Sequence, residues 1–147
     1  MTVTVTWPND VSPGLWPFRI SVPDGWTAIE PPDALIAFLG PERHGSRPTV
    51  LVFGARLPDA QPLGDLAEQV LLDLGAGSVL RPVAEDGRAV VREAVVDVDG
   101  RAFRHVVLVT GRQDRSPNGL RTVHTLLGTQ PAAEPDVLAD ILTSFTG

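Results

Sequence analysis

Alternating apolar and polar residues surround two Asp-Gly pairs in the middle of the chain. Asp86-Gly87 and Asp99-Gly100 each lie between runs of β-branched residues. An Asp-Gly pair in such a setting favours a type I′ hairpin turn, because both central positions of that turn need a positive φ. The pattern therefore predicts three antiparallel strands, over residues 78–84, 88–98 and 101–112.

The turn at Asp99-Gly100 also predicts a register for its hairpin. Every second residue then shares a face. The more apolar face is expected to meet the main core, and it holds Val90, Arg92, Ala94, Val96, Phe103, His105, Val107 and Val109. The other face is half charged, so we expect it to be only partly covered. On that face Glu93 and Arg104 lie diagonally, close enough to form an ion pair.

Apolar residues at intervals of three and four predict two helices. The first follows Pro62, ends at a left-handed cap on Gly75, and has the stripe Leu63, Leu66, Ala67, Val70, Leu71 and Leu74. The second is expected to start at Pro135, with a buried stripe of Val137, Leu138, Ile141, Leu142 and Phe145.

The apolar patterns in the rest of the chain predict further strands. Residues 2–6 alternate and favour an edge strand, and residues 18–22, 34–39 and 120–129 are also strand-like. Residues 49–57 are almost continuously apolar, which is typical of a strand buried on both faces. Trp26 follows a Pro-Asp-Gly turn, and its side chain is predicted to be buried in the core.

This order of elements predicts an α+β fold. We expect an antiparallel β-sheet of about six to seven strands with two main helices packed on it. The chain has 147 residues and no linker-like segment, so residues 1–147 are predicted to form a single domain.

Composition narrows the classes of function. The formal net charge of −6 disfavours binding to nucleic acid and docking on anionic membranes. The absence of cysteine excludes a disulfide framework, a thiol nucleophile and a thiolate metal site. The first residues do not resemble a secretory signal, and no apolar run approaches the roughly 20 residues of a membrane span. We therefore expect a cytoplasmic protein.

The sequence contains no residue pattern typical of a catalytic site. Ser46 and Ser78 do not match the Gly-x-Ser-x-Gly elbow of hydrolases. His44, His105 and His124 lack the short spacings of a zinc site. The carboxylates are dispersed, and many belong to turns. We expect no enzyme activity, no metal and no cofactor.

Two segments are candidate surfaces for a protein partner. Trp7 and Trp16 lie in proline-rich segments, where they either cover the sheet or form an exposed aromatic patch. Arg112, Arg115 and Arg121 surround a polar loop. That loop is either simply solvated or able to receive an acidic partner.

Arg92 and His105 are polar residues on the more apolar face of the predicted hairpin. A pocket between the sheet and a helix would place these two side chains inside it. They support an alternative function, that of a small-molecule carrier with an apolar pocket.

Three local motifs carry a family resemblance. They are FRISVPDGW at residues 18–26, a helix followed by a hairpin meander with an Asp-Gly-Arg turn at residues 86–88, and DILTSF at residues 140–145. In this order they resemble the Mog1/PsbP-like superfamily, in particular its small actinobacterial members related to the LpqN/LpqT lipoproteins. The resemblance covers roughly residues 18–145 and implies an α/β/α sandwich. The chain departs from those lipoproteins in having no signal and no lipobox cysteine.

The resemblance also implies a class of function, since known members of the superfamily are mostly non-enzymatic binding or assembly factors. Our preferred prediction is a non-catalytic protein-interaction or assembly module with an unknown protein partner. The carrier remains the alternative. A homodimer formed through the exposed strand predicted at residues 2–6 is compatible with both.

Overall fold

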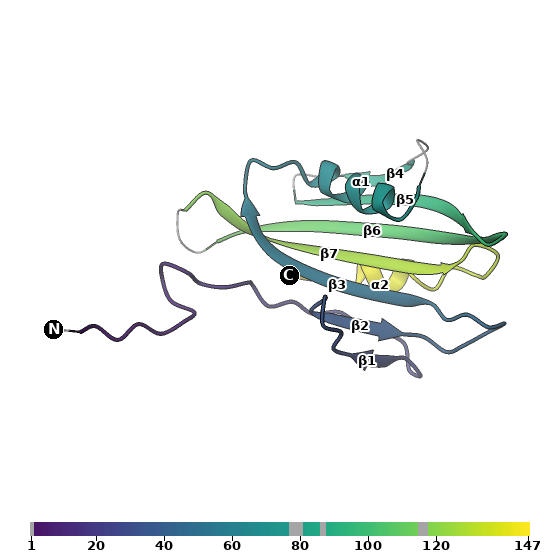
Figure 1. Ribbon diagram of the computed structural model, residues 1–147, viewed down its shortest axis with the longest axis horizontal. Coiled ribbons are helices and arrows are strands. Elements are labelled where there is room, and N and C mark those ends of the chain that lie inside the picture. Colours follow the sequence, from purple (N-terminus) through teal and green to yellow (C-terminus); the bar gives the residue numbers. More distant parts are fainter. Residues whose placement is uncertain (1, 77–80, 86–87, 115–117) are drawn as a thin grey trace.

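The computed structural model describes residues 2–76, 81–85, 88–114 and 118–147. Within these ranges seven strands form one antiparallel sheet in the order β1-β2-β3-β7-β6-β5-β4 (Figure 1). The strands are β1 (Thr27–Ile29), β2 (Ile36–Leu39), β3 (Thr49–Pro58), β4 (Arg81–Glu85), β5 (Ala89–Val98), β6 (Arg101–Gln113) and β7 (Leu120–Pro131). The helices are α1 (Leu63–Asp73) and α2 (Ala139–Thr143). The predicted α+β fold is confirmed.

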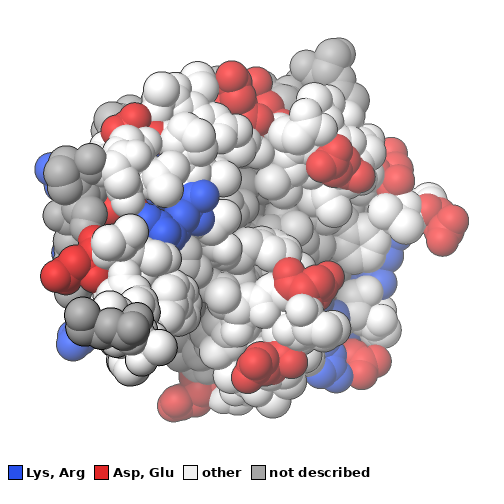
Figure 2. Space-filling view, turned by 60° about the vertical axis from the view of Figure 1, so that its left-hand side comes forward, with Lys and Arg blue, Asp and Glu red and all other residues white. Residues whose placement is uncertain are grey.

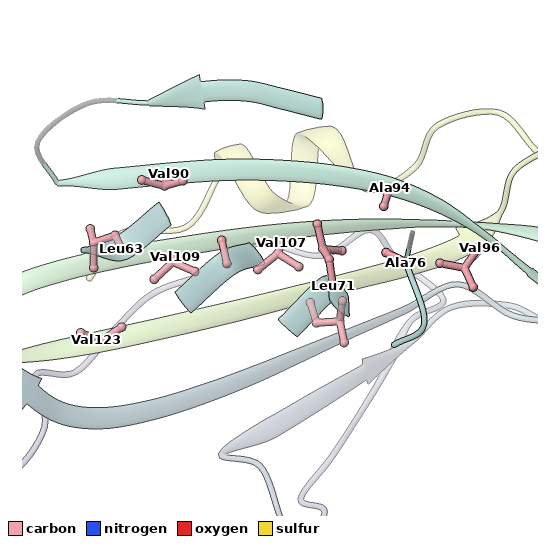
Figure 3. Close-up of a cluster of buried hydrophobic side chains, with 11 residues drawn as sticks. Leu63, Leu71, Ala76, Val90, Ala94, Val96, Val107, Val109 and Val123 are labelled. Atoms are coloured by element: carbon pink, nitrogen blue, oxygen red, sulfur yellow. The ribbon is translucent and has the colours of Figure 1, made fainter. Parts of the chain in front are cut away.

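Helix α1 covers β5 and β6 on one face of the sheet (Figure 1). Leu63, Ala67 and Leu71 of its predicted stripe are buried against valines and alanines of these strands, several of which Figure 3 labels. Leu66 and Val70 are half-buried, and Leu74, the last member of the predicted stripe, is 37% exposed. Gly75 adopts a φ of +91°, and the N–H groups of Gly75 and Ala76 donate to the carbonyls of Leu72 and Leu71. The left-handed cap predicted at Gly75 is confirmed.

Helix α2, its flanking residues and the extended segment of residues 18–22 cover the opposite face. The core on this side combines residues of the sheet with Leu138, Ile141, Leu142 and Phe145, and Phe18, Ile20, Val22 and Trp26 pack against it. Val106 and Leu108 are therefore only 6% and 8% exposed. The half-charged face of the β5–β6 hairpin was expected to be only partly covered. It is covered more fully than that, because α2 packs on this side of β6 and β7.

The hairpin of β5 and β6 has the predicted register. Val98 pairs with Arg101, and the φ angles of Asp99 and Gly100 are +52° and +81°, as a type I′ turn requires. Arg104 Nε lies 2.8 Å from Glu93 Oε1, which confirms the diagonal ion pair. The predicted turn at Asp86-Gly87 and the first residues of the predicted strand 78–84 lie outside the described residues.

The N-terminal strands were predicted at the wrong places. Residues 2–6 form no strand, and Val3 and Val5 are 83% and 73% exposed. Residues 18–22 form a single bridge, between Arg19 and Thr146. The outer position is taken instead by β1, which pairs with β2. An alternating pattern shows which side chains share a face, but it does not supply a neighbouring strand.

The second helix is shorter than predicted. The segment from Pro135 stays non-helical until Leu138, and Asp136 Oδ1 accepts hydrogen bonds from the N–H groups of Leu138 and Ala139 at 2.9 and 3.1 Å. Val137 is 40% exposed, whereas the other four members of the predicted stripe are buried.

Strand β3 is buried on one face only. Val50 and Val52 are fully enclosed on the α2 side. Leu51, Phe53 and Leu57 point to the other side and are half-buried, because α1 lies over β5 and β6 and does not extend across β3 (Figure 1). The prediction that residues 49–57 are buried on both faces is wrong.

Candidate functional site

Trp16 and Arg112, predicted to belong to two separate surfaces, lie against each other. The Arg112 guanidinium carbon is 3.6 Å from the centroid of the Trp16 ring, a cation–π contact. Trp16 Nε1 donates to the carbonyl of Gln113 at 2.8 Å, and the Trp16 N–H donates to Thr122 Oγ1 at 3.1 Å. The N-terminal segment and the end of β6 therefore form one continuous surface.

Trp7 belongs to the same end of the molecule. It is 70% exposed, and its Nε1 donates to Ser12 Oγ at 2.9 Å. Ser12 Oγ also lies 3.5 Å from Arg56 Nη1, and Arg56 Nη2 is 2.6 Å from Asp114 Oδ2. Burial raises the pKa of Asp114, but hydrogen bonds from Arg56 and Asn118 outweigh it and hold that pKa below its ordinary value. The ion pair ties β3 to the residue that follows β6, and Ser12 connects the Trp7 loop to it through Arg56.

Arg121 points away from Trp16. Its side chain crosses the backbone of Gly111, where an added Cβ would lie 3.0 Å from Arg121 Cδ. Its Nη2 donates to the carbonyl of Gln61, ahead of α1, and its Nε is buried with no hydrogen-bond partner among the described residues. Arg115, the third predicted arginine of this loop, lies outside the described residues.

A groove of about 740 Å³ lies where the ends of β5 and β6 meet the last described residues. Its walls include Arg88, Ala89, Thr110, Gly111, Arg112, Gln113, Arg121, Phe145, Thr146 and Gly147. The charged side chains in this described set are all arginines. The face of the molecule in Figure 2 carries both acidic and basic side chains, and the acidic ones are more widespread.

Arg92 is 6% exposed and lies beneath the start of α1. An added Cβ at Gly64 would be 3.0 Å from Arg92 Nη2, and Arg92 Nε is 3.5 Å from Glu68 Oε1. A cavity of about 370 Å³ adjoins Arg92, with mostly polar walls that also include Arg121. The pocket predicted at Arg92 is thus present as a polar cavity rather than an apolar one.

His105 and His124 lie on opposite faces of the sheet. His105 Nδ1 is 2.9 Å from Thr129 Oγ1, and this residue is not part of the wall of the Arg92 cavity. His124 is 1% exposed and packs against the rings of Phe18 and Phe145, at centroid distances of 5.2 and 5.4 Å. Burial lowers the pKa of both histidines.

The third histidine lies apart from these two. His44 is in the exposed loop before β3, with its Nδ1 3.0 Å from Glu134 Oε1. Among the described residues, no three His, Cys, Asp or Glu side chains gather where they would hold a metal ion. No helix in the described ranges has the length and apolar character needed to cross a membrane.

An apolar groove lies beside α1 on the side of β3 that no helix covers. Its volume is about 230 Å³, and its apolar lining includes Phe53, Leu57, Leu66 and Val70. This surface was not predicted as a site. The only indication of this surface in the sequence is the continuous apolar run of residues 49–57. The single helix on this side cannot cover β3 as well as β5 and β6, so part of that run stays exposed.

The structure defines an α+β protein whose antiparallel sheet carries a helix on each face. A similar fold is seen in the crystal structure of LpqN, which is involved in cell envelope biogenesis of Mycobacterium tuberculosis. The TM-score is 0.64, the sequence identity is 14%, and the match covers 88% of this chain and 82% of the LpqN chain. At this identity the likeness concerns the fold. No protein-family model matches the chain, and no curated protein matches its sequence.

Proposed function

We propose that this chain is a non-catalytic protein-interaction or assembly module of the Mog1/PsbP-like superfamily. One observation carries the proposal: the α1 side of β3 is apolar, half-exposed and without a helix over it. Exposed apolar surface with a groove is typical of a binding face for another protein. The similarity of the fold to LpqN and the order of the local motifs support the family assignment.

The contact surface is the groove between β3 and α1. Its walls are formed by Phe53 and Leu57 on one side and by Leu66 and Val70 on the other. An apolar side chain of a partner fits such a groove, because a few buried anchors contribute most of the energy of a protein interface. The Trp16–Arg112 stack is not part of this surface, because Arg112 and Thr122 point to the α2 face of the sheet.

Site-specific photo-crosslinking in a lysate of the native cells tests this proposal. A photoreactive residue at Ala55, which is exposed on β3 between Phe53 and Leu57, is expected to give a crosslinked product of one defined mass. The matched control is Val95, which is exposed on β5 and faces the other side of the sheet. Identical products from both positions, or none from Ala55, would contradict the proposal.

The carrier remains the alternative, and the cavity at Arg92 supports it. Native mass spectrometry of freshly purified protein separates the two functions. A co-purified small ligand favours the carrier, and a bare chain mass favours the interaction module. Cytoplasmic action is part of the proposal and is tested by cell fractionation.

A further inference from the structure

We propose that residues 2–6 of a second copy of this chain pair with an open edge of β3 and add a short strand to the sheet. Each copy has one such segment and one such edge, so two copies can exchange them symmetrically in a closed dimer. The inference rests on the proposed function and deepens it, because it names a partner and a mode of contact for the same side of β3.

The second half of β3 has a neighbouring strand on one side only. Strand β7 pairs with β3 along its whole length, from Thr49 to Pro58, whereas β2 pairs with it only from Thr49 to Val52. Within the described ranges, no other strand lies along residues 53–58 (Figure 1). This stretch is therefore an open edge of the sheet.

Two residues of the open edge direct their backbone hydrogen-bonding groups outward. The Val52 carbonyl accepts a hydrogen bond from the Leu35 N–H at 2.8 Å, so it points away from β7. Because this direction alternates along a strand, the N–H and carbonyl groups of Gly54 and Arg56 point the same way. No residue of the described segments outside the sheet forms a backbone hydrogen bond with them. Edge groups of this kind favour the addition of a further strand.

The open edge also has space beside it and apolar side chains on it. At its start, a hollow of about 270 Å³ lies between residues 32–35 and the pair Phe53 and Gly54. Farther along, Ala55 is exposed and Leu57 is half-buried, and both line the apolar groove beside α1. An added strand would thus cover apolar side chains as well as pair the backbone.

Residues 2–6 have the properties of such a strand. They alternate threonine and valine, which are β-branched residues that favour strands. Val3 and Val5 are 83% and 73% exposed, and Figure 1 shows this end of the chain leading away from the sheet. Pairing with an open edge would bury these valines and provide the segment with backbone partners.

The alternation also determines how the segment would lie on β3. Residues that are directly opposite in an antiparallel pair point to the same face. The apolar side chains of the open edge point to the α1 side, so Val3 and Val5 are expected to lie there as well. The threonines then lie opposite Gly54 and Arg56 and exchange backbone hydrogen bonds with them. Ala55 lies opposite one of the two valines.

Disulfide crosslinking tests this arrangement, because the chain contains no cysteine of its own. Ala55→Cys protein is mixed with protein that carries Val3→Cys or Val5→Cys and a C-terminal size tag. In a glutathione redox buffer, at least one mixture is expected to form the mixed disulfide, since opposite Cβ atoms lie about 4.5–5.5 Å apart. Thr4→Cys is the matched control and should give at least about tenfold less, because its side chain would point to the other face.

Proline variants test the backbone pairing by sedimentation equilibrium. Thr4→Pro removes an N–H that the pairing uses and is expected to raise the Kd of the dimer by about tenfold or more. Val3→Pro is the matched control, because the N–H at that position would point away from β3, where an edge strand tolerates proline. Circular dichroism verifies that both variants fold.

The inference is overturned if the purified chain stays monomeric at all concentrations, if neither valine position crosslinks more than Thr4→Cys, or if the two prolines weaken the dimer equally. A disulfide within one chain of the double variant Val5→Cys and Ala55→Cys, in place of one between chains, would also overturn it. A monomeric chain that still gives a product from Ala55 in the lysate would contradict this inference and leave the proposed function standing.

Discussion

At the scale of single residues, His124 stands out because an ionisable ring is enclosed by aromatic ones. Its Nε2 has no hydrogen-bond partner among the described residues, and Phe18 and Phe145 contact its ring from the two ends of the chain. Burial lowers the pKa of His124 and outweighs a backbone hydrogen bond with Trp16, which raises it. The folded protein therefore keeps this ring neutral at neutral pH.

The lowered pKa of His124 predicts a loss of stability in mild acid. Below pH 6.5, the ordinary pKa of histidine, the unfolded chain binds a proton that folded His124 accepts less readily. The free energy of unfolding should thus fall between pH 7.5 and pH 5.0, measured by urea denaturation. His124→Phe should reduce this fall, and His105, whose pKa is also lowered, accounts for what remains. His44→Gln is the exposed control, and an undiminished fall in His124→Phe would refute the assignment.

Arg104 offers a second test at this scale, because it joins two carboxylates. Its Nε is 2.8 Å from Glu93 Oε1 and its Nη1 is 2.9 Å from Asp136 Oδ2. Arg104→Gln leaves the buried Glu93 carboxylate with less compensation and should cost about 2–4 kcal/mol of unfolding free energy. Arg47→Gln, which breaks a solvent-exposed pair, should cost less than about 1 kcal/mol. Equal losses in urea denaturation would contradict this interpretation.

At the scale of elements, α1 is held to the sheet by one face. Leu71 is fully buried, whereas its neighbour Leu72 is 48% exposed. Leu71→Ala should lower the free energy of unfolding by about 2–5 kcal/mol, since it leaves a cavity between α1 and the sheet. Leu72→Ala removes the same atoms from the same helix and should cost under about 1 kcal/mol. Similar losses in the two variants would mean that α1 does not pack as described.

The elements that could be predicted from the sequence are those specified by local chemistry. The turn at Asp99-Gly100, the cap at Gly75 and the helical stripe from Leu63 each depend on residues close in sequence. The errors concern contacts between distant segments. Residues 2–6 have a strand-like pattern but no neighbouring strand, and the short strand β1 gains its place only by pairing with β2.

The candidate surfaces show the same limit. Trp16 and Arg112 were each selected from the sequence, but their stacking joins segments 96 positions apart and has no local signal. The sequence predicts that both faces of β3 are buried. The apolar run shows which side chains are apolar, but it does not show whether a helix covers them.

At the scale of the whole molecule, the exposed segment of residues 2–6 tests the predicted homodimer. Val3 and Val5 share one side of an extended segment and are largely exposed. If this segment pairs with a second copy, Val5→Asp should weaken dimerisation by about tenfold, because it places a charge in an apolar contact. Val11→Asp, also at an exposed valine, is the control. Sedimentation velocity measures both, and a monomer at all concentrations would refute the homodimer.

The closure of the α2 side by both ends of the chain has a consequence for biosynthesis. Arg19 and Thr146 exchange two backbone hydrogen bonds, and the Ser21 N–H donates to Ser144 Oγ, so segments more than 120 residues apart are tied together. This layer cannot be completed on the ribosome until the last of these residues has left the exit tunnel. Until then the nascent polypeptide displays the apolar underside of β6 and β7, the kind of surface that chaperones bind during translation.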